Sequence, residues 1–200
     1  MSSSPLLPHG GYRKLRSYKV AQIIYDATMV FSHRFLRHDH RTTDQMVQAA
    51  RSGVRNISEG SGAAATSRKA EMTLTNVARA SLNDELLPDF ISFLTQRGLA
   101  VWPKESRFAL AMRERLAVDC DPRIGSSSNG RLSGLDALPT FVEQADPEIA
   151  ANAMIWAINQ ASYLWLRQLD SLGRQFMDNG GFTEQLYKRR ASQRRTPKSD

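Results

Sequence analysis

The stretch that decides the fold runs from Leu74 to Leu94 and reads LTNVARASLNDELLPDFISFL. Apolar residues recur in it at every fourth position: Leu74, Ala78, Leu82, Leu86, Phe90 and Leu94. This spacing is typical of a helix with one buried side. Thr66 or Ser67 is placed to cap such a helix at its start, and Gly98 is placed to end it after Arg97.

Pro88 lies inside this predicted helix. A proline has no backbone N–H to donate, and its ring clashes with the preceding turn of a helix. We therefore expect a kink near Asp84 in place of two separate helices.

Two further helices are predicted before this stretch. Residues 12–38 contain no Gly or Pro and repeat apolar residues at helical spacing. Residues 43–59 follow a capping box of Thr42 and Gln45, and the Gly60–Gly62 segment is predicted to end that helix. Gly53 lies inside it, where a glycine allows a second helix to approach closely.

A fourth long helix is predicted for residues 147–178, starting at Asp146-Pro147 and ending before Gly180-Gly181. Its apolar residues cover more than one side, so we expect it to have more than one packing partner. Between Leu99 and Asp146 the periodicity fades, leaving a short helix from Pro103 to Val118 and a loop at 121–134. A short helix from Thr183 is expected before the basic end of the chain.

No segment alternates apolar and polar residues as a strand does, so the predicted fold class is all-α. Four long helices predict an antiparallel four-helix bundle with a loop-rich insertion at 99–146. The expected organisation is a flexible lead-in at residues 1–11, the bundle domain at 12–187 and a basic disordered tail at 188–200.

Composition excludes several classes of protein. The chain has 200 residues, of which 41% are hydrophobic, so one globular domain is expected. No apolar run approaches the roughly 20 residues that a membrane-spanning helix needs. The first residues lack the order of a signal peptide, and a single cysteine, Cys120, excludes an intrachain disulfide. A cytoplasmic setting is therefore expected.

The positive charge is concentrated at one end. The chain has 27 basic and 20 acidic residues, a net charge of +7. Residues 188–200 hold one acid and six of the basic residues, which leaves 21 basic and 19 acidic residues elsewhere, a net of +2. The six are Lys188, Arg189, Arg190, Arg194, Arg195 and Lys198. Such a tail contacts nucleic-acid phosphates in some proteins and is merely solvated in others.

Several motifs resemble one known family. They are Tyr12–Leu15 (YRKL), Asn56–Gly60 (NISEG), Ala78–Leu82 (ARASL), Asn159–Leu164 (NQASYL) and Gly180–Phe182 (GGF). Together they are similar to the four-helix-bundle family of the 23S rRNA-intervening-sequence proteins, and more closely to its four-helix-bundle suffix-domain branch. The likeness extends over about residues 12–190 and is weakest at 99–146.

The resemblance implies a homo-oligomer, because members of this family form homopentamers, rings of bundles around a central channel. One relative, the accessory variability determinant of diversity-generating retroelements, binds nucleic acid and a reverse transcriptase. The resemblance therefore implies RNA, DNA or a protein such as a reverse transcriptase as partner. It assigns no binding residue to this chain.

A polar cluster is predicted on the second and third helices. Spacing of four residues places Arg51, Arg55 and Glu59 on one side of the second helix, and Asn56 lies one step round. Arg79 and Glu85 belong to the third helix. These residues either grip a phosphate, chiefly through Arg51 and Arg55, or form an ion-pair network that caps the Gly60 turn and fixes the register of the helices.

Three histidines lie close together in sequence beside Asp39. His33 and His38 point in different directions on a helix, and His40 is expected beyond its end, so we predict no metal site. Arg34 and His40 fit the R-x(4–6)-H spacing of helical HEPN ribonucleases, in which a histidine acts as general acid or base. That spacing also arises easily by chance in an arginine-rich chain.

The resulting expectation is a non-enzymatic homo-oligomer without a cofactor that binds nucleic acid, RNA first, or an enzyme acting on nucleic acid. A protein-interaction scaffold and a metal-independent ribonuclease are the alternatives. No phosphate-binding loop or nucleophile motif occurs in the sequence. Trp102, Trp156 and Trp165 are candidates for stacking on bases. The spacing of Trp156 and Trp165 fits a helix core or interface better.

Overall fold

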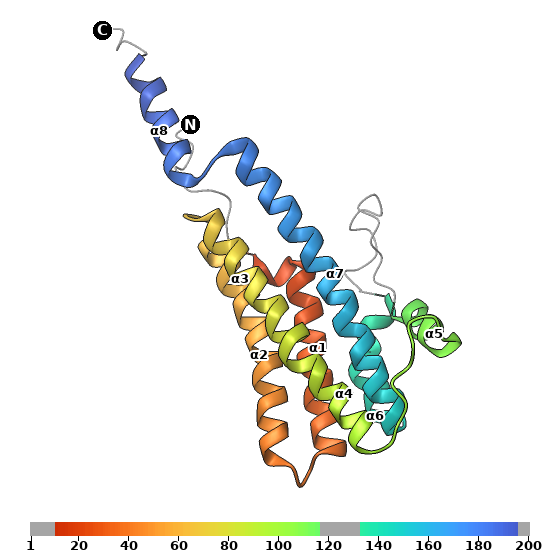
Figure 1. The fold of residues 1–200 in the computed structure, drawn as a ribbon. Coiled ribbons are helices and arrows are strands. Elements are labelled where there is room, and N and C mark those ends of the chain that lie inside the picture. The colour runs from red at the N-terminus through yellow and green to blue at the C-terminus, as the bar shows by residue number, and fades with distance from the viewer. Residues whose placement is uncertain (1–10, 117–132, 196–200) are drawn as a thin grey trace.

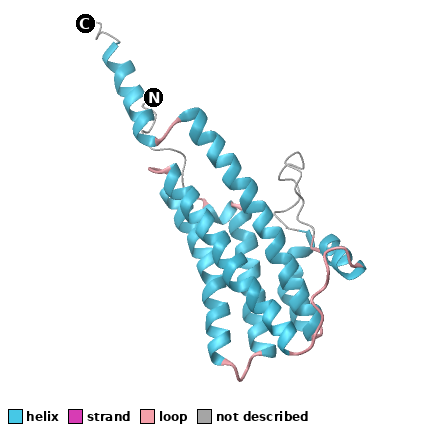
Figure 2. Ribbon diagram, in the orientation of Figure 1, coloured by secondary structure: helices cyan, strands magenta, loops and turns pink. Residues whose placement is uncertain are grey.

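The computed structural model describes residues 11–116 and 133–195, and every regular element in these ranges is a helix (Figure 2). The all-helical fold class is therefore confirmed. The elements are η1 (Tyr12–Lys14), α1 (Arg16–Phe35), α2 (His40–Ala63), α3 (Arg68–Ala80), η2 (Ser81–Leu86), α4 (Leu87–Gln96), α5 (Arg107–Arg115), η3 (Ser133–Ala137), α6 (Leu138–Gln144), α7 (Pro147–Asn179) and α8 (Phe182–Arg195).

Helix α2 begins earlier and ends later than predicted. Asp39 is its N-cap and accepts from the Thr42 backbone N–H at 3.0 Å, so the capping box at Thr42 is wrong. The helix also continues through Gly60 to Ala63, so the predicted stop is wrong as well. The reason is close packing against α3, because a Cβ at Gly60 would lie 3.3 Å from the Leu74 Cβ.

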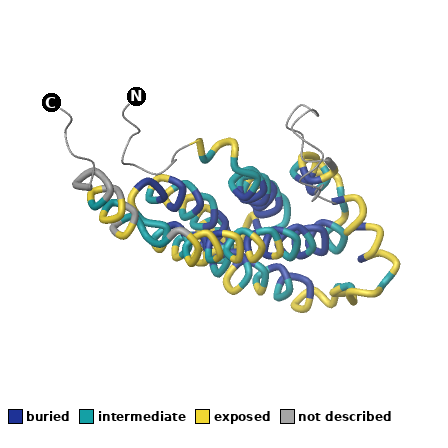
Figure 3. The backbone as a smooth tube through the Cα atoms, turned by 90° about the horizontal axis from the view of Figure 1, so that it is seen from above, coloured by how far each residue is buried: buried dark blue, intermediate teal, exposed yellow. Residues whose placement is uncertain are grey.

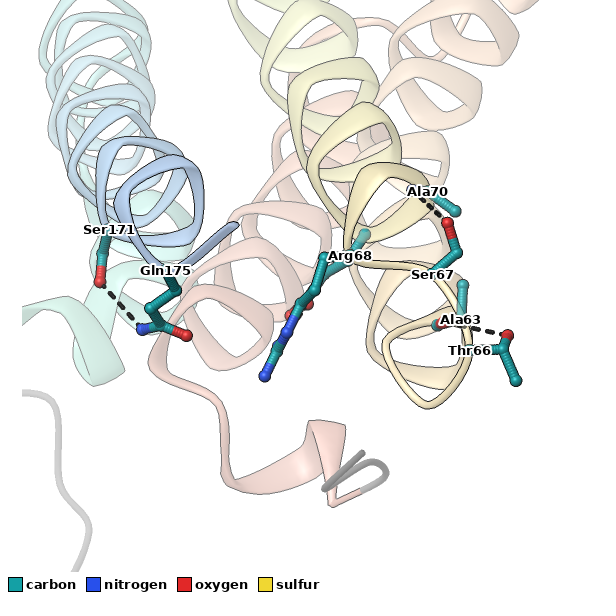
Figure 4. Close-up of polar contacts among 8 residues, drawn as sticks. Ala63, Thr66, Ser67, Arg68, Ala70, Ser171 and Gln175 are labelled. Carbon is teal, nitrogen blue, oxygen red and sulfur yellow. Dashed lines mark hydrogen bonds and ion pairs between the residues drawn. The ribbon is translucent and has the colours of Figure 1, made fainter. Parts of the chain in front are cut away.

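The deciding stretch forms one helical run from Arg68 to Gln96. Ser67 caps it and accepts from the Ala70 N–H at 3.1 Å, as Figure 4 shows. Gly98 ends it with φ 64°, and the Leu99 N–H donates back to the Leu94 carbonyl at 2.9 Å. Both predicted ends are confirmed.

The predicted interruption near Asp84 takes the form of a π-helical segment, η2, between α3 and α4. The Leu87 N–H donates to the Leu82 carbonyl, five residues back. Pro88 follows directly and has no N–H to donate to the Asp84 carbonyl four residues back, as an α-helix requires. A wider turn just before Pro88 is consistent with this missing hydrogen bond.

The π segment keeps the apolar ladder on one side. In a regular α-helix, residues four apart rotate about 40° past a full turn, so a strict four-residue repeat drifts round the helix. A wider turn reverses part of this drift. Accordingly all the ladder residues from the middle of α3 to the end of α4 are fully buried: Ala78, Leu82, Leu86, Phe90 and Leu94.

The long helices pack along their lengths around an aromatic cluster (Figure 1). The Phe31 ring of α1 meets the Phe90 and Phe93 rings of α4 edge-on, with centroids 4.9 and 4.8 Å apart. Buried residues of α1, α2, α4 and α7 make up this core. Figure 3 colours the buried parts of the backbone dark blue. Helix α7 contacts α1, α3, α4, α5 and α6, which confirms the prediction of several partners.

The region between α4 and α7 contains more helix than expected. Its first helix, α5, starts at Arg107 with Ser106 as cap, and not at Pro103. Helix α6 was not predicted because it has only seven residues. It packs on α1 through buried Leu138 and Val142. Cys120 and most of the predicted loop at 121–134 lie outside the described residues.

A buried asparagine fixes the start of this region on α7. Asn152 is 1% exposed, and its amide accepts from the Trp102 N–H at 2.9 Å and donates to the Ala100 carbonyl at 2.8 Å. Glu148 accepts a further hydrogen bond of 3.1 Å from the Trp102 indole N–H.

Among the described helices, none has the length and apolar character required to cross a membrane.

The close approach of α2 to η2 gives a stability prediction. A Cβ at Gly53 would lie 3.0 Å from Cγ of fully buried Leu82. Gly53→Val should therefore lower the free energy of unfolding by about 1–3 kcal/mol, as overpacking does elsewhere. Gly62→Val is the matched control, because nothing lies within 4 Å of a Cβ there, and it should change stability by less than about 0.5 kcal/mol. Equal losses in urea unfolding would contradict the close contact.

Candidate nucleic-acid interface

Helix α7 extends well beyond the packed core. It has 33 residues against 20 in α1, a difference of about 20 Å in length. Figure 1 shows its C-terminal part leaving the other long helices and leading into α8. After Leu172, no residue whose burial the structure describes is buried. This end of the molecule is therefore supported by little packing within the described chain.

Helix α7 exposes a row of apolar side chains that begins beside the core and continues into the overhanging part. Tyr163, Leu166 and Met177 are 57%, 52% and 82% exposed, and their spacing places them on one side of the helix. Asp170 and Arg174 lie on the same side and form an ion pair. We call Tyr163, Leu166 and Met177 the α7 row; large exposed apolar groups in such a row are typical of contact surfaces.

Helix α8 carries the predicted basic residues. Gly180 ends α7 with φ 72°, and Glu184 in the first turn of α8 accepts from the Gly181 N–H at 3.2 Å. The helix contains five basic residues and one acid. Figure 1 shows it as the outermost helix at this end of the molecule.

The prediction of a disordered tail from residue 188 is wrong as far as Arg195, since this part is helical. Ala, Gln, Lys and Arg are good helix formers, and the cations gather toward the C-terminal end, where the helix dipole favours them. Lys188 and Arg190 are exposed. Arg189, Arg194 and Arg195 belong to the helix, although their side chains lie outside the description, as does all of Lys198.

The predicted polar cluster does not form one network. Neither Arg55–Glu59 nor any other pair of its members is joined by an ion pair among the described residues. Arg79 instead donates to Asn76 on its own helix at 3.3 Å. The N-I-S-E-G segment continues α2, so no helix end is present there for these residues to cap.

The turn after α2 has a different ion pair. Arg68 and Glu71 at the start of α3 are joined at 2.7 Å, and Glu71 is buried. This ion pair lies next to the Ser67 cap of α3, whereas the sequence predicted an ion-pair network at the Gly60 turn.

Asn56 takes part in a contact between α2 and η2. Its amide donates to the carbonyl and hydroxyl oxygens of Ser52 at 2.9 and 3.1 Å. The Ser52 hydroxyl in turn lies 2.9 Å from the Ser81 hydroxyl. Asn56 therefore belongs to the polar edge of the Gly53–Leu82 contact and fixes the register of the two helices.

Arg51 and Glu85 line one open groove between α2 and the η2–α4 segment, of about 740 Å³. Asp44 and Asp89 also line it, so three carboxylates face one guanidinium. Burial raises the pKa of Asp89, and the charge of Glu85 raises it further. An acidic groove repels phosphate, so this location of Arg51 argues against its predicted role in gripping nucleic acid.

The groove gives a titration prediction. In Glu85→Gln the pKa of Asp89 should fall, yet stay above the ordinary aspartate value, because burial is the larger cause. Carboxyl carbon shifts measured by NMR across the acid range report this directly. An Asp89 pKa that does not move, or that returns fully to the ordinary value, would contradict the assignment.

The same shift has a consequence for stability. The folded chain holds the Asp89 proton more tightly than the unfolded chain, so the free energy of unfolding falls as pH rises from the ordinary pKa through the raised one. Asp89→Asn removes this dependence. The free energy of unfolding of the variant should therefore rise relative to that of the parent as the pH increases over that interval.

The Arg34–His40 pair expected for a ribonuclease is separated in the structure. The Arg34 guanidinium donates to the Val142 and Ala145 carbonyls at 2.6 and 2.8 Å and so holds the end of α6. His40 instead lines a groove between α1 and α2 together with His33. No group of three potential metal ligands occurs in the described parts of the chain.

The tryptophans take the places expected from their spacing. Trp165 is fully buried and Trp156 half-buried, on the core side and flank of α7. Trp102 lies against Phe108 with ring centroids 5.5 Å apart, at the mouth of an apolar groove of about 470 Å³ that Phe141 also lines. Phe108 is 53% exposed. Sequence reasoning missed this groove, since α6 supplies one wall.

Comparison with known proteins adds no relationship: no family model, no curated protein and no solved structure matches this chain.

Proposed function

We propose that the chain is a non-enzymatic antiparallel four-helix bundle, of the kind formed by the 23S rRNA-intervening-sequence family, that self-associates and binds RNA. The observation that carries the proposal is the overhang formed by the end of α7 and by α8. Exposed Tyr163 and Leu166 lead up to this overhang and exposed Met177 lies on it, and the helix that follows is basic and lies outside the core.

The basic helix supports nucleic acid as the partner. Exposed cations on a helix with little apolar surface bind phosphates chiefly by releasing counterions. The groove beside Arg51 is less suitable, because three carboxylates line it. Binding is therefore assigned to Lys188, Arg190 and the other basic residues of α8.

Replacing Lys188 and Arg190 by Gln should weaken binding to single-stranded RNA and lower the salt slope of the affinity by about 1.4, at about 0.7 for each phosphate contact. Both residues are exposed, so the helix should persist. Fluorescence anisotropy at several salt concentrations measures both effects.

Lys104→Gln with Arg113→Gln is the control for that variant. Both residues are exposed on the α5 side, and the pair removes the same charge. The control should retain the parental slope. A full-length chain that binds no RNA at low salt would remove the proposal altogether.

The α7 row supports self-association. Three large apolar side chains on one side of a helix remain uncovered in the single chain, and a second copy is the partner that the family resemblance implies. The resemblance extends this to a pentamer.

Leu166→Asp should shift the midpoint of assembly to at least about tenfold higher concentration, because it puts a charge into an apolar contact. Leu110→Asp is the matched control, since Leu110 on α5 is 50% exposed against 52% for Leu166. Light scattering after size exclusion, with nuclease-treated protein, separates the two. Equal behaviour of the two variants would place the contact elsewhere.

A second candidate is a protein-interaction scaffold, favoured by the apolar groove at Trp102, Phe108 and Phe141. A defined protein that copurifies after nuclease treatment, and is lost in Phe108→Ser, would support this function in place of RNA binding.

A further inference from the structure

A small groove lies at the end of the molecule opposite α8, between the last turns of α1 and the first turns of α2 (Figure 1). It measures about 290 Å³. Its polar lining consists of Ser32, His33, Arg37, His40 and Thr43. Among the described residues, no acidic side chain lines it.

Ser32 is the unusual member of this lining. It is 2% exposed, and its hydroxyl has no hydrogen-bond partner in the part of the chain that the structure describes. Thr28, one turn earlier and fully buried, does bond the Ile24 carbonyl at 2.7 Å, as hydroxyls within helices commonly do. A buried hydroxyl without a partner is costly, and an acceptor that enters the groove beside it removes that cost.

Two carbonyls at the end of α1 already accept hydrogen bonds. The Arg37 Nε donates to the His33 carbonyl at 3.0 Å. The Leu36 carbonyl accepts from the Asp39 N–H at 2.9 Å and from the Thr43 hydroxyl at 3.4 Å. These two acceptors are thus engaged, while the terminal nitrogens of Arg37 can still donate to a ligand.

The start of α2 adds to this donor character. The first amides of a helix carry partial positive charge, and His40 is the first residue of α2. The one carboxylate of the turn, Asp39, accepts from the Thr42 N–H and does not line the groove. A lining of donors without a facing carboxylate fits an anion.

The rest of the lining is apolar and comes from Met29, Leu36 and Val47. Met29 is 44% exposed, which leaves a surface for a flat apolar group next to the donors. A phosphate attached to a nucleoside combines these two features. Arginine and imidazole N–H groups are suited to the phosphate, and thioether and aliphatic groups to a base.

We propose that this groove binds the phosphate of a nucleotide, with Arg37, His33 and His40 around the phosphate and the Ser32 hydroxyl donating to it. A free nucleoside monophosphate and a phosphate within an RNA strand present the same chemistry. The site does not depend on RNA binding by α8, because it lies at the other end of the molecule.

The test is an NMR titration of the full chain in which the imidazole signals of His33 and His40 are followed. The probes are inorganic phosphate, adenosine 5′-monophosphate and a short single-stranded RNA. Saturable shifts with the monophosphate identify a free nucleotide as the source, and shifts with RNA alone identify a strand. The monophosphate should bind more tightly than inorganic phosphate, because only it reaches Met29 and Val47.

Three variants make the assignment specific. Arg37→Gln should weaken binding at least about tenfold, and Ser32→Ala about threefold, as expected for a charged and a neutral hydrogen bond. Ser32→Ala removes a hydroxyl without a partner, so its melting temperature should not fall. Arg41→Gln is the control: Arg41 lies on the same turn, is exposed and does not line the groove, so affinity should change less than about twofold.

Imidazole signals that do not move with any probe overturn the proposal. So does equal weakening by Arg37→Gln and Arg41→Gln, which would indicate only general attraction to the basic turn. If RNA binds through α8 while neither RNA nor the monophosphate moves the imidazole signals, the groove proposal is overturned and the proposed function of α8 is unaffected.

Discussion

The contact between Gly53 and Leu82 is the constraint on which the arrangement of the helices depends. It packs α2 against η2, the π-helical segment that precedes Pro88. The wider turn of this segment keeps Leu82, Leu86 and Phe90 on one buried side of the helix. The Ser52–Ser81 hydroxyl contact fixes the register beside it. A larger residue at position 53 would push the two helices apart.

This packing leaves the two ends of the molecule with different properties. At one end the α1–α2 turn gathers donors around a small groove. At the other end, α7 extends beyond the helices that it packs against and is followed by the basic helix α8. The middle is occupied by apolar packing and by hydrogen bonds such as those of Asn152, which hold the α5–α6 region in place. Both proposed phosphate contacts therefore lie away from the core.

Much of the fold was predictable because the long helices carry strong local signals: the four-residue ladder, the Ser67 cap, the Gly98 stop and the Pro88 interruption. The errors arose where tertiary packing overrides a local signal. Gly60 reads as a stop, yet it is buried against α3. The site was harder to predict, since it depends on which side chains tertiary packing brings together. Arg34 and His40 are six residues apart but serve different contacts, whereas Arg51 and Asp89 meet from separate helices.

Native mass spectrometry of the full chain and of a chain ending at Gly181, each with and without nuclease treatment, tests the central claim most directly. The account predicts masses at one multiple of 22.4 kDa for the full chain and the corresponding multiple for the shorter one. The untreated full chain should carry additional nucleic-acid mass, and the untreated shorter chain should carry much less. Single-chain masses throughout, or equal nucleic-acid mass on both untreated chains, would contradict it.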